Sequence, residues 1–110
     1  MRRPQVLGIF RAQLQFRKCT DLRPWIVIDV RGEKEAVVLP ISAQMDLYEG
    51  PGHHFLLDAA HPNFLETGLR RTCYIDDRFP VVVLMDQLVE YRGRLVGELA
   101  TSFERWGGWT

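Results

Sequence analysis

The stretch that decides the fold is Asp21–Gln44, which reads DLRPWIVIDVRGEKEAVVLPISAQ. It holds two apolar runs, Trp25–Val30 and Ala36–Leu39, joined by the polar segment Arg31–Glu35. The first run is rich in β-branched residues, which suits a central strand covered on both faces. A turn signal at Gly32 separates the runs. We therefore expect two antiparallel strands joined by a short loop, with the two ends of the stretch close together.

Short strands are also predicted on both sides of this stretch. In Val6–Phe16 apolar and polar residues alternate, a period of two that is typical of a half-buried strand. Further along, His54–Leu57, Leu69–Ile75 and Pro80–Met85 are strand candidates, and Asp76–Phe79 between the last two predicts a hairpin turn. The first three strands should form a meander.

Helical pieces are expected to be few. One turn is predicted near Pro62 with Gly68 as its terminator, and Leu95–Phe103 fits one helical face. Arg92–Arg94 is predicted as a turn, and Arg105–Thr110 as too short for an element. Short strands in a small chain tend to remove their edges by bending or closing. We predict a mainly β fold, a bent antiparallel sheet or barrel with one or two short helices, in a single domain over 1–110.

Composition bounds the function only loosely. The 110 residues carry 14 positive and 14 negative charges, so net charge gives no hint of a nucleic-acid partner. No stretch approaches 18 apolar residues, and we expect neither a signal peptide nor a membrane span. Cys19 and Cys73 are far apart and lack zinc-ligand spacing. Two free thiols in a reducing cytoplasm is the simplest interpretation, although a disulfide stays open.

Several side chains could carry chemistry, each with a plainer alternative. His53, His54 and His61 lie near a Gly/Pro loop and could act as acid or base, or could simply be turn residues. Asp76–Asp77, with Asp86 or Glu90, could pair as carboxylates or form a turn. Arginines could form an anion-binding surface with aromatic residues that stack on bases, or be solvated charges. These residues are Arg70, Arg71, Arg92, Arg94 and Arg105, with Trp25, Tyr48, Trp106 and Trp109.

The order of short motifs resembles the MazF/PemK family of toxin–antitoxin ribonucleases from Leu7 to Leu99. The segment 6–10, VLGIF, is similar to the family's glycine-containing first strand. The segment 22–28, LRPWIVI, is similar to its Arg-Pro and apolar strand, and 40–44, PISAQ, to its Pro-Ile-Thr segment with serine for threonine. Later parts follow its Gly-Leu, Asp-Gln-Ile and Arg-Leu order. They are 68–69, 86–88 and 94–99.

The resemblance implies a small SH3-like barrel that forms a homodimer, cleaves single-stranded RNA without metal or other cofactor, and is covered by an antitoxin protein. The family's arginine and hydroxyl residues map to Arg23 and Ser42, which we predict to be catalytic. The candidate substrate-binding residues are Gln44, His53, His54, Arg70 and Arg71.

The chain also departs from the family pattern. The loop Arg17–Asp21 is short, Gly8-Ile9 replaces Gly-Asp, and 88–90 reads Leu-Val-Glu in place of Ile-Arg-Thr. Few residues follow Leu99, so the family's longer C-terminal helix is expected to be missing. The alternative is a non-enzymatic protein of the same fold, either an inactive binding module or a CcdB-like gyrase poison. The segment 106–109, WGGW, is similar to the C-terminal aromatic and glycine residues of the CcdB-like type.

Overall fold

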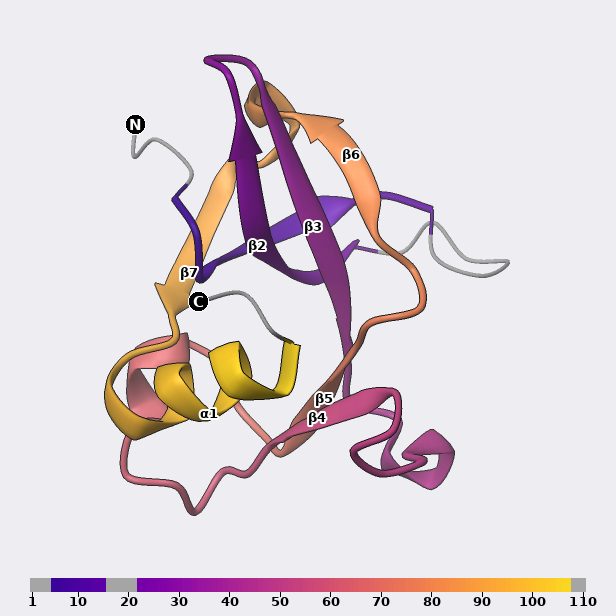
Figure 1. The fold of residues 1–110 in the computed structure, drawn as a ribbon, viewed down its shortest axis with the longest axis vertical. Helices are drawn as coiled ribbons and strands as arrows, with labels where there is room; N and C mark the ends of the chain where they lie inside the picture. The colour runs from indigo at the N-terminus through magenta and orange to yellow at the C-terminus, as the bar shows by residue number, and fades with distance from the viewer. Residues whose placement is uncertain (1–4, 16–21, 108–110) are drawn as a thin grey trace.

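One antiparallel sheet forms the body of the computed structural model, which describes residues 5–15 and 22–107 (Figure 1). Its strands in this part of the chain are β1 (Gly8–Gln13), β2 (Leu22–Arg31), β3 (Glu35–Ser42), β4 (His54–Leu57), β5 (Cys73–Asp76), β6 (Val81–Leu84) and β7 (Glu90–Arg94). Short 3-10 turns connect some of them, namely η1 (Met45–Leu47), η2 (Leu65–Thr67) and η3 (Met85–Gln87). The helix α1 (Gly97–Gly107) follows β7. The predicted mainly β class is confirmed.

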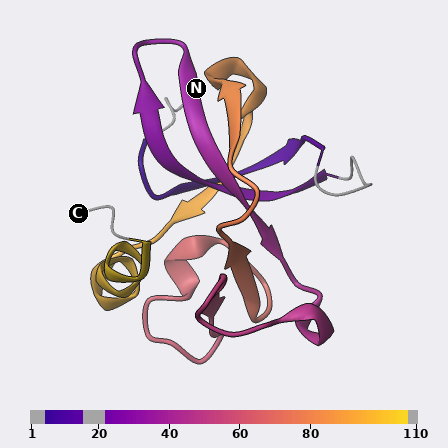
Figure 2. The ribbon, with the colours of Figure 1, turned by 45° about the vertical axis from the view of Figure 1, so that its right-hand side comes forward.

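The strand order is β4-β5-β3-β2-β1-β7, with β6 paired to β3 beside β5. The outermost strands β4 and β7 do not pair with each other in the described residues, so the bent sheet is not closed into a complete barrel. Figures 1 and 2 show the β2–β3 hairpin at the upper end of the molecule, from which β3 runs down to the region of β5. Among the described residues no helix has the length and apolar character needed to cross a membrane.

The deciding stretch folds as its sequence predicts. Trp25 pairs with Pro40 and Arg31 with Glu35, so β2 and β3 are antiparallel, and Gly32 takes a left-handed φ of 63° in the turn between them. β1 pairs with the other edge of β2, which confirms the meander. Two apolar cores cover the two faces of the sheet. One contains Ile26, and the other contains Trp25 and Val27.

The predicted hairpin between β5 and β6 is wrong. Both strands pair with β3, through Ile75 opposite Ile41 and Val81 opposite Val38. The chain therefore passes along β3 in two segments, and residues 77–80 form an excursion between them. At the start of this excursion an oxygen of the Asp76 carboxylate accepts a hydrogen bond from the backbone N–H of Arg78, 3.0 Å away. This side-chain turn bends the chain without reversing it.

Two further expectations about the C-terminal third are corrected. Residues Arg92–Arg94 belong to β7, since Gly93 pairs with Ile9 and Arg94 with Gly8. The helix predicted on Leu95–Phe103 is α1, which runs further, through Gly107, into the tail that was expected to be too short for an element. Gly97, with a φ of 59°, begins this helix and so does not weaken its interior. Leu99, Ala100 and Phe103 bury one face of α1 against the sheet.

The single predicted helical turn before Gly68 is confirmed in kind. It is η2, which begins at Leu65, and Gly68 ends it with a left-handed φ of 71°. Cys19 and the loop Arg17–Asp21 lie outside the described residues.

Candidate functional site

The two ends of the deciding stretch meet at a pocket of about 370 Å³, which we call the inner pocket. Because β2 and β3 are antiparallel, the first residues of β2 lie beside the last residues of β3. β5 pairs with the end of β3, so the segment that leads into β5 reaches the same place. The inner pocket is lined by Leu22, Arg23, Pro24, Ile41, Ser42, Ala43, Gln44, Leu69, Arg70, Arg71 and Cys73.

The inner pocket thus brings together most of the residues singled out from the sequence. They are Arg23, Ser42, Gln44, Arg70 and Arg71. Among the described residues that line it there is no carboxylate. A hollow lined by arginines without acidic neighbours attracts anions, and an arginine fork suits a phosphate, whose oxygens it can bind in pairs.

Ser42 is the hydroxyl of this pocket, and only 5% of it is exposed. Its Oγ accepts a hydrogen bond from the backbone N–H of Gln44 at 3.2 Å. A serine hydroxyl has one hydrogen to donate as well, and within the described residues Ser42 uses it for no hydrogen bond. Its donor therefore remains available to an oxygen of a ligand. Arg23 is half-buried beside it, with its Nε atom buried.

Arg70 and Arg71 supply the exposed charges. They follow Gly68-Leu69 and precede β5. Within the described residues neither guanidinium forms a hydrogen bond or an ion pair. Both are therefore free to bind an anion from solution.

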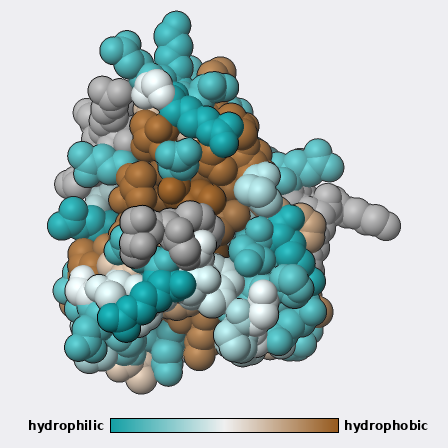
Figure 3. All heavy atoms as spheres, viewed as in Figure 1, coloured by the Kyte–Doolittle hydropathy of each residue, from teal (hydrophilic) through white to brown (hydrophobic). Residues whose placement is uncertain are grey.

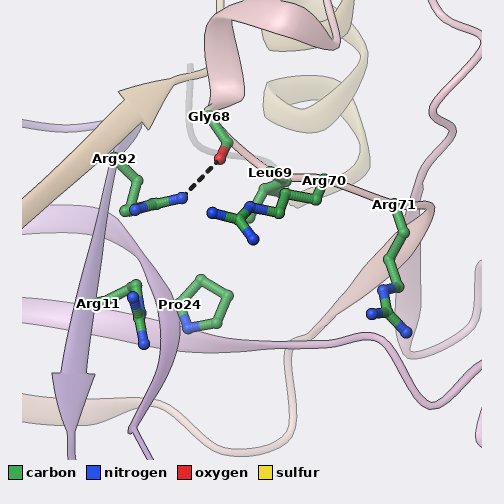
Figure 4. A pocket seen from close by; sticks show the side chains of 7 residues that line it. All are labelled: Arg11, Pro24, Gly68, Leu69, Arg70, Arg71 and Arg92. Carbon is green, nitrogen blue, oxygen red and sulfur yellow. Dashed lines mark hydrogen bonds between the residues drawn. The ribbon is translucent and has the colours of Figure 1, made fainter.

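A second pocket of about 380 Å³, which we call the outer pocket, adjoins the first (Figure 4). Its lining residues are Arg11, Pro24, Gly68, Leu69, Arg70, Arg71 and Arg92. Four of these also line the inner pocket, so the two hollows form one arginine groove. Arg92 was a sequence candidate, whereas Arg11 was missed. The signal for Arg11 was present, because alternation in β1 places it on the opposite face from buried Phe10 and Ala12, next to Pro24 of β2.

The structure does not bring the candidate histidines to the groove. His54 is fully buried under the loop that precedes β4, and its ring stacks on that of Tyr74 with centroids 4.2 Å apart. Its Nδ1 accepts from the backbone N–H of Glu49 at 2.8 Å, which leaves Nε2 to donate to Asp76 at 3.1 Å. His54 therefore cannot contact RNA, and its predicted substrate role is corrected. His53 lies 3.6 Å from Asp77 and lines neither pocket.

The candidate carboxylates are occupied elsewhere. Asp76, 1% exposed, is bonded to His54 and Arg78. Burial tends to raise the pKa of Asp76, but hydrogen bonds from the side chain and backbone of Arg78 and from His54 outweigh burial and hold it below its usual value. The hydrogen bond from Arg78 likewise lowers the pKa of Glu49. Glu90 instead pairs with Arg11 and Arg92 beside the outer pocket.

Some remaining candidates are excluded by burial or position. Trp25 is fully buried and cannot stack on a base, and the Nε1 of Trp106 donates to the carbonyl of Pro51 at 2.6 Å. Burial raises the pKa of the Cys73 thiol to about 12, so this residue is not a nucleophile at neutral pH. Arg94 and Arg105 line neither pocket.

The fold and the site thus define a small antiparallel β protein with an arginine-lined groove where β2, β3 and the segment before β5 meet. No protein-family model matches this chain, and a search of curated proteins finds no match.

Proposed function

We propose that this protein is a MazF/PemK-type toxin that binds single-stranded RNA in the arginine groove and cleaves it without metal. The observation that supports the proposal is that Arg23 and Ser42, the two residues matched to the family's catalytic pair, line one pocket with Gln44, Arg70 and Arg71. Such a pocket can hold one phosphodiester against several donors at once.

The proposed reaction is a transesterification within the strand. The 2′-oxygen of a ribose attacks the adjacent phosphorus as the bond from phosphorus to the 5′-oxygen breaks, which leaves a 2′,3′-cyclic phosphate and a 5′-hydroxyl. The phosphorane between these states carries extra negative charge, which the guanidinium of Arg23 and the hydroxyl of Ser42 would stabilise by hydrogen bonds. Arg23 is permanently protonated and cannot be the base. With no described histidine in the groove, the 2′-proton would leave to solvent, which also protonates the departing 5′-oxygen.

A cleavage assay in excess chelator tests the proposal. Wild type, Arg23→Ala and Arg94→Ala proteins are incubated with single-stranded RNAs of varied sequence, and the product ends are identified by mass spectrometry. Arg94 is the matched control because it is an exposed arginine that lines neither pocket. Cyclic phosphate products from wild type and Arg94→Ala, with loss of cleavage in Arg23→Ala, are expected. Absence of cleavage by wild type on every RNA rejects the enzyme.

A binding module without cleavage is the second candidate. One observation favours it. The nearly buried hydroxyl of Ser42, at the end of β3, already accepts a hydrogen bond from the backbone N–H of Gln44, as a purely structural serine would. In that case wild type would bind RNA and leave it intact. A gyrase poison would use C-terminal aromatic residues to contact its target. The indole N–H of Trp106 instead donates to the carbonyl of Pro51 in the same chain, which does not favour this alternative. If RNA is neither bound nor cleaved, a gyrase inhibition assay is the next experiment.

The proposed partners are a second copy of the chain and an antitoxin whose disordered segment covers the groove. Hydrophobic surface gathers over β2 and β3 with β6 beside them (Figure 3), and Val82 and Leu84 of β6 are about half exposed. Apolar surface of this kind favours a protein interface. Light scattering of wild type against a Val82→Asp/Leu84→Asp double variant tests the dimer. A wild type that stays monomeric at high concentration contradicts it.

A further inference from the structure

The outer pocket of the groove, built from Arg11, Arg70 and Arg92, has no role in the chemistry described so far. We propose that it is a second phosphate-binding subsite, which holds a neighbouring phosphate of the same RNA strand whose reacting phosphate lies in the inner pocket. This inference rests on the proposed RNA binding and deepens it, because it states how much of the strand the protein grips. The support is that the two pockets share Pro24, Leu69, Arg70 and Arg71, so a strand can pass from one to the other.

The charges of the outer pocket favour an anion. Arg11 and Arg92 both contact the same oxygen of Glu90, at 3.2 and 3.5 Å. One carboxylate thus holds two guanidiniums in place while neutralising only one of them. Arg70 adds a third guanidinium, which no described residue pairs. Among the described residues, Arg11, Arg70 and Arg92 thus bring three positive charges against the one negative charge of Glu90, which leaves a net positive hollow with donors unused.

The backbone fixes the distance across this pocket. Gly68 lies directly on β7, since a Cβ atom on it would be 2.0 Å from the carbonyl oxygen of Arg92. The same holds in reverse for Gly93, whose Cβ would be 2.2 Å from the carbonyl oxygen of Glu66. Only glycine at both positions allows this approach. The guanidinium of Arg92 also donates to the carbonyl of Gly68 at 3.3 Å, the dashed line in Figure 4.

This contact positions Arg92 before any ligand arrives. Figure 4 shows the side chains of Arg70, Arg92 and Arg11 gathered around Pro24, whereas the side chain of Arg71 lies apart from them. The segment that carries Arg70 is held by η2, because buried Thr67 accepts a hydrogen bond from the N–H of Leu69 at 3.1 Å. A pre-positioned set of forks binds phosphate with little loss of side-chain freedom.

The lining also indicates which part of a strand the outer pocket takes. Within the part of the chain that the structure describes, its lining has no aromatic side chain on which a base could stack, and its apolar side chains are Pro24 and Leu69. Backbone phosphates and sugars fit such a surface, and they carry no sequence information. The outer pocket should therefore strengthen binding to all single strands equally and leave sequence choice to other residues.

The test uses fluorescein-labelled 2′-O-methyl RNA, which lacks the attacking hydroxyl and cannot be cleaved. A mixed-sequence dinucleotide has one internal phosphate, and a hexanucleotide has several. Fluorescence anisotropy gives Kd for each over a range of salt. Arg11→Gln and Arg92→Lys are the variants, because both keep a donor for Glu90, and Arg94→Ala is the control. Thermal unfolding verifies that each variant is folded.

The subsite predicts a length-dependent effect. Arg11→Gln should weaken binding of the hexanucleotide about tenfold and lower its salt dependence by about 0.7 in the logarithmic slope, with the dinucleotide unchanged. Arg92→Lys should act in the same direction, and Arg94→Ala should do neither. Equal weakening of both lengths, or no effect on either, overturns the subsite, as does failure of wild type to bind the hexanucleotide.

Further results distinguish the subsite from binding of free phosphate and from the proposed cleavage activity. Competition by inorganic phosphate together with no gain in affinity from dinucleotide to hexanucleotide would mean that the pocket takes free phosphate, which also overturns it. If Arg11→Gln weakens binding of the hexanucleotide alone, and the wild type fails to cleave unmodified RNA, the subsite is supported and the enzyme is rejected. If the wild type cleaves RNA, and Arg11→Gln cleaves it and binds the hexanucleotide as well as the wild type does, the enzyme is supported and the subsite is rejected.

Discussion

The buried carboxylate of Asp76 receives three hydrogen bonds from Arg78. The backbone N–H and Nε of Arg78 donate to Oδ1 at 3.0 and 3.1 Å, and a terminal nitrogen donates to Oδ2 at 3.1 Å. Arg78 also reaches Glu49 at 2.8 Å, so one arginine ties the excursion after β5 to the loop before β4. These contacts hold the ionised form of Asp76 and explain its lowered pKa.

The first prediction is a loss of stability in acid that depends on Asp76. Because its pKa is lower in the folded chain than the ordinary 3.8, its stabilising contribution is fully present above about pH 4 and disappears as pH falls through the folded value. Asp76→Asn should lower the free energy of unfolding at pH 7 by about 2 kcal/mol and flatten its fall below pH 4. Urea unfolding at several pH values measures both. The control, exposed Asp77→Asn, should change stability by about 0.5 kcal/mol or less.

The second prediction concerns the approach of Gly68 to β7. Gly68→Ala places alanine in a left-handed backbone conformation that it disfavours, and its Cβ clashes with the Arg92 carbonyl. The substitution should therefore lower the free energy of unfolding by about 3 kcal/mol. Gly32→Ala is the matched control, since it has a similar φ of 63° but no atom within 4 Å of the new Cβ. It should cost about 1 kcal/mol. Equal losses in chemical denaturation would contradict the close approach.

The sequence was sufficient for the parts of the fold that depend on local pattern. The β-branched run at Trp25–Val30 and the turn at Gly32 predicted β2 and β3, and antiparallel pairing alone placed Arg23 near Ser42. The failure at Asp76–Phe79 has a physical reason. Two apolar strands around a polar segment pair with each other in a hairpin or both pair with a third strand, and the local sequence is the same for both.

The functional residues that were missed or misplaced depend on partners distant in the chain. The buried ring of His54 depends on Asp76, more than twenty residues later, whose carboxylate accepts from Nε2, while the backbone N–H of Glu49 donates to Nδ1. Arg11 joins the groove only because β1 lies between β2 and β7, next to Pro24 on one side and Glu90 on the other. Period-two alternation identifies the face on which Arg11 lies, but the strand order decides what that face meets.

The third prediction is that the thiol of Cys73 resists alkylation in the folded protein. It is 3% exposed, and burial raises its pKa to about 12. At pH 8 only about one thiol in 10⁴ would then be ionised, compared with about a quarter at an ordinary thiol pKa of about 8.5. In a Cys19→Ser variant, mass spectrometry should find no iodoacetamide adduct before unfolding and full modification in urea. Rapid labelling of the folded chain would show that Cys73 is accessible from the inner pocket that it lines.

The fourth prediction separates a catalytic hydroxyl at Ser42 from a structural one. Ser42→Ala removes both the acceptor for the N–H of Gln44 and the donor available to the phosphate, and should lower the cleavage rate about a hundredfold while costing about 1 kcal/mol of stability. Ser42→Thr keeps the hydroxyl and should retain most of the activity. Single-turnover cleavage of one RNA by the three proteins, with urea unfolding of each, measures both quantities. A rate that is equal in Ser42→Ala and wild type would leave Arg23 without its proposed partner and assign Ser42 to the end of β3 alone.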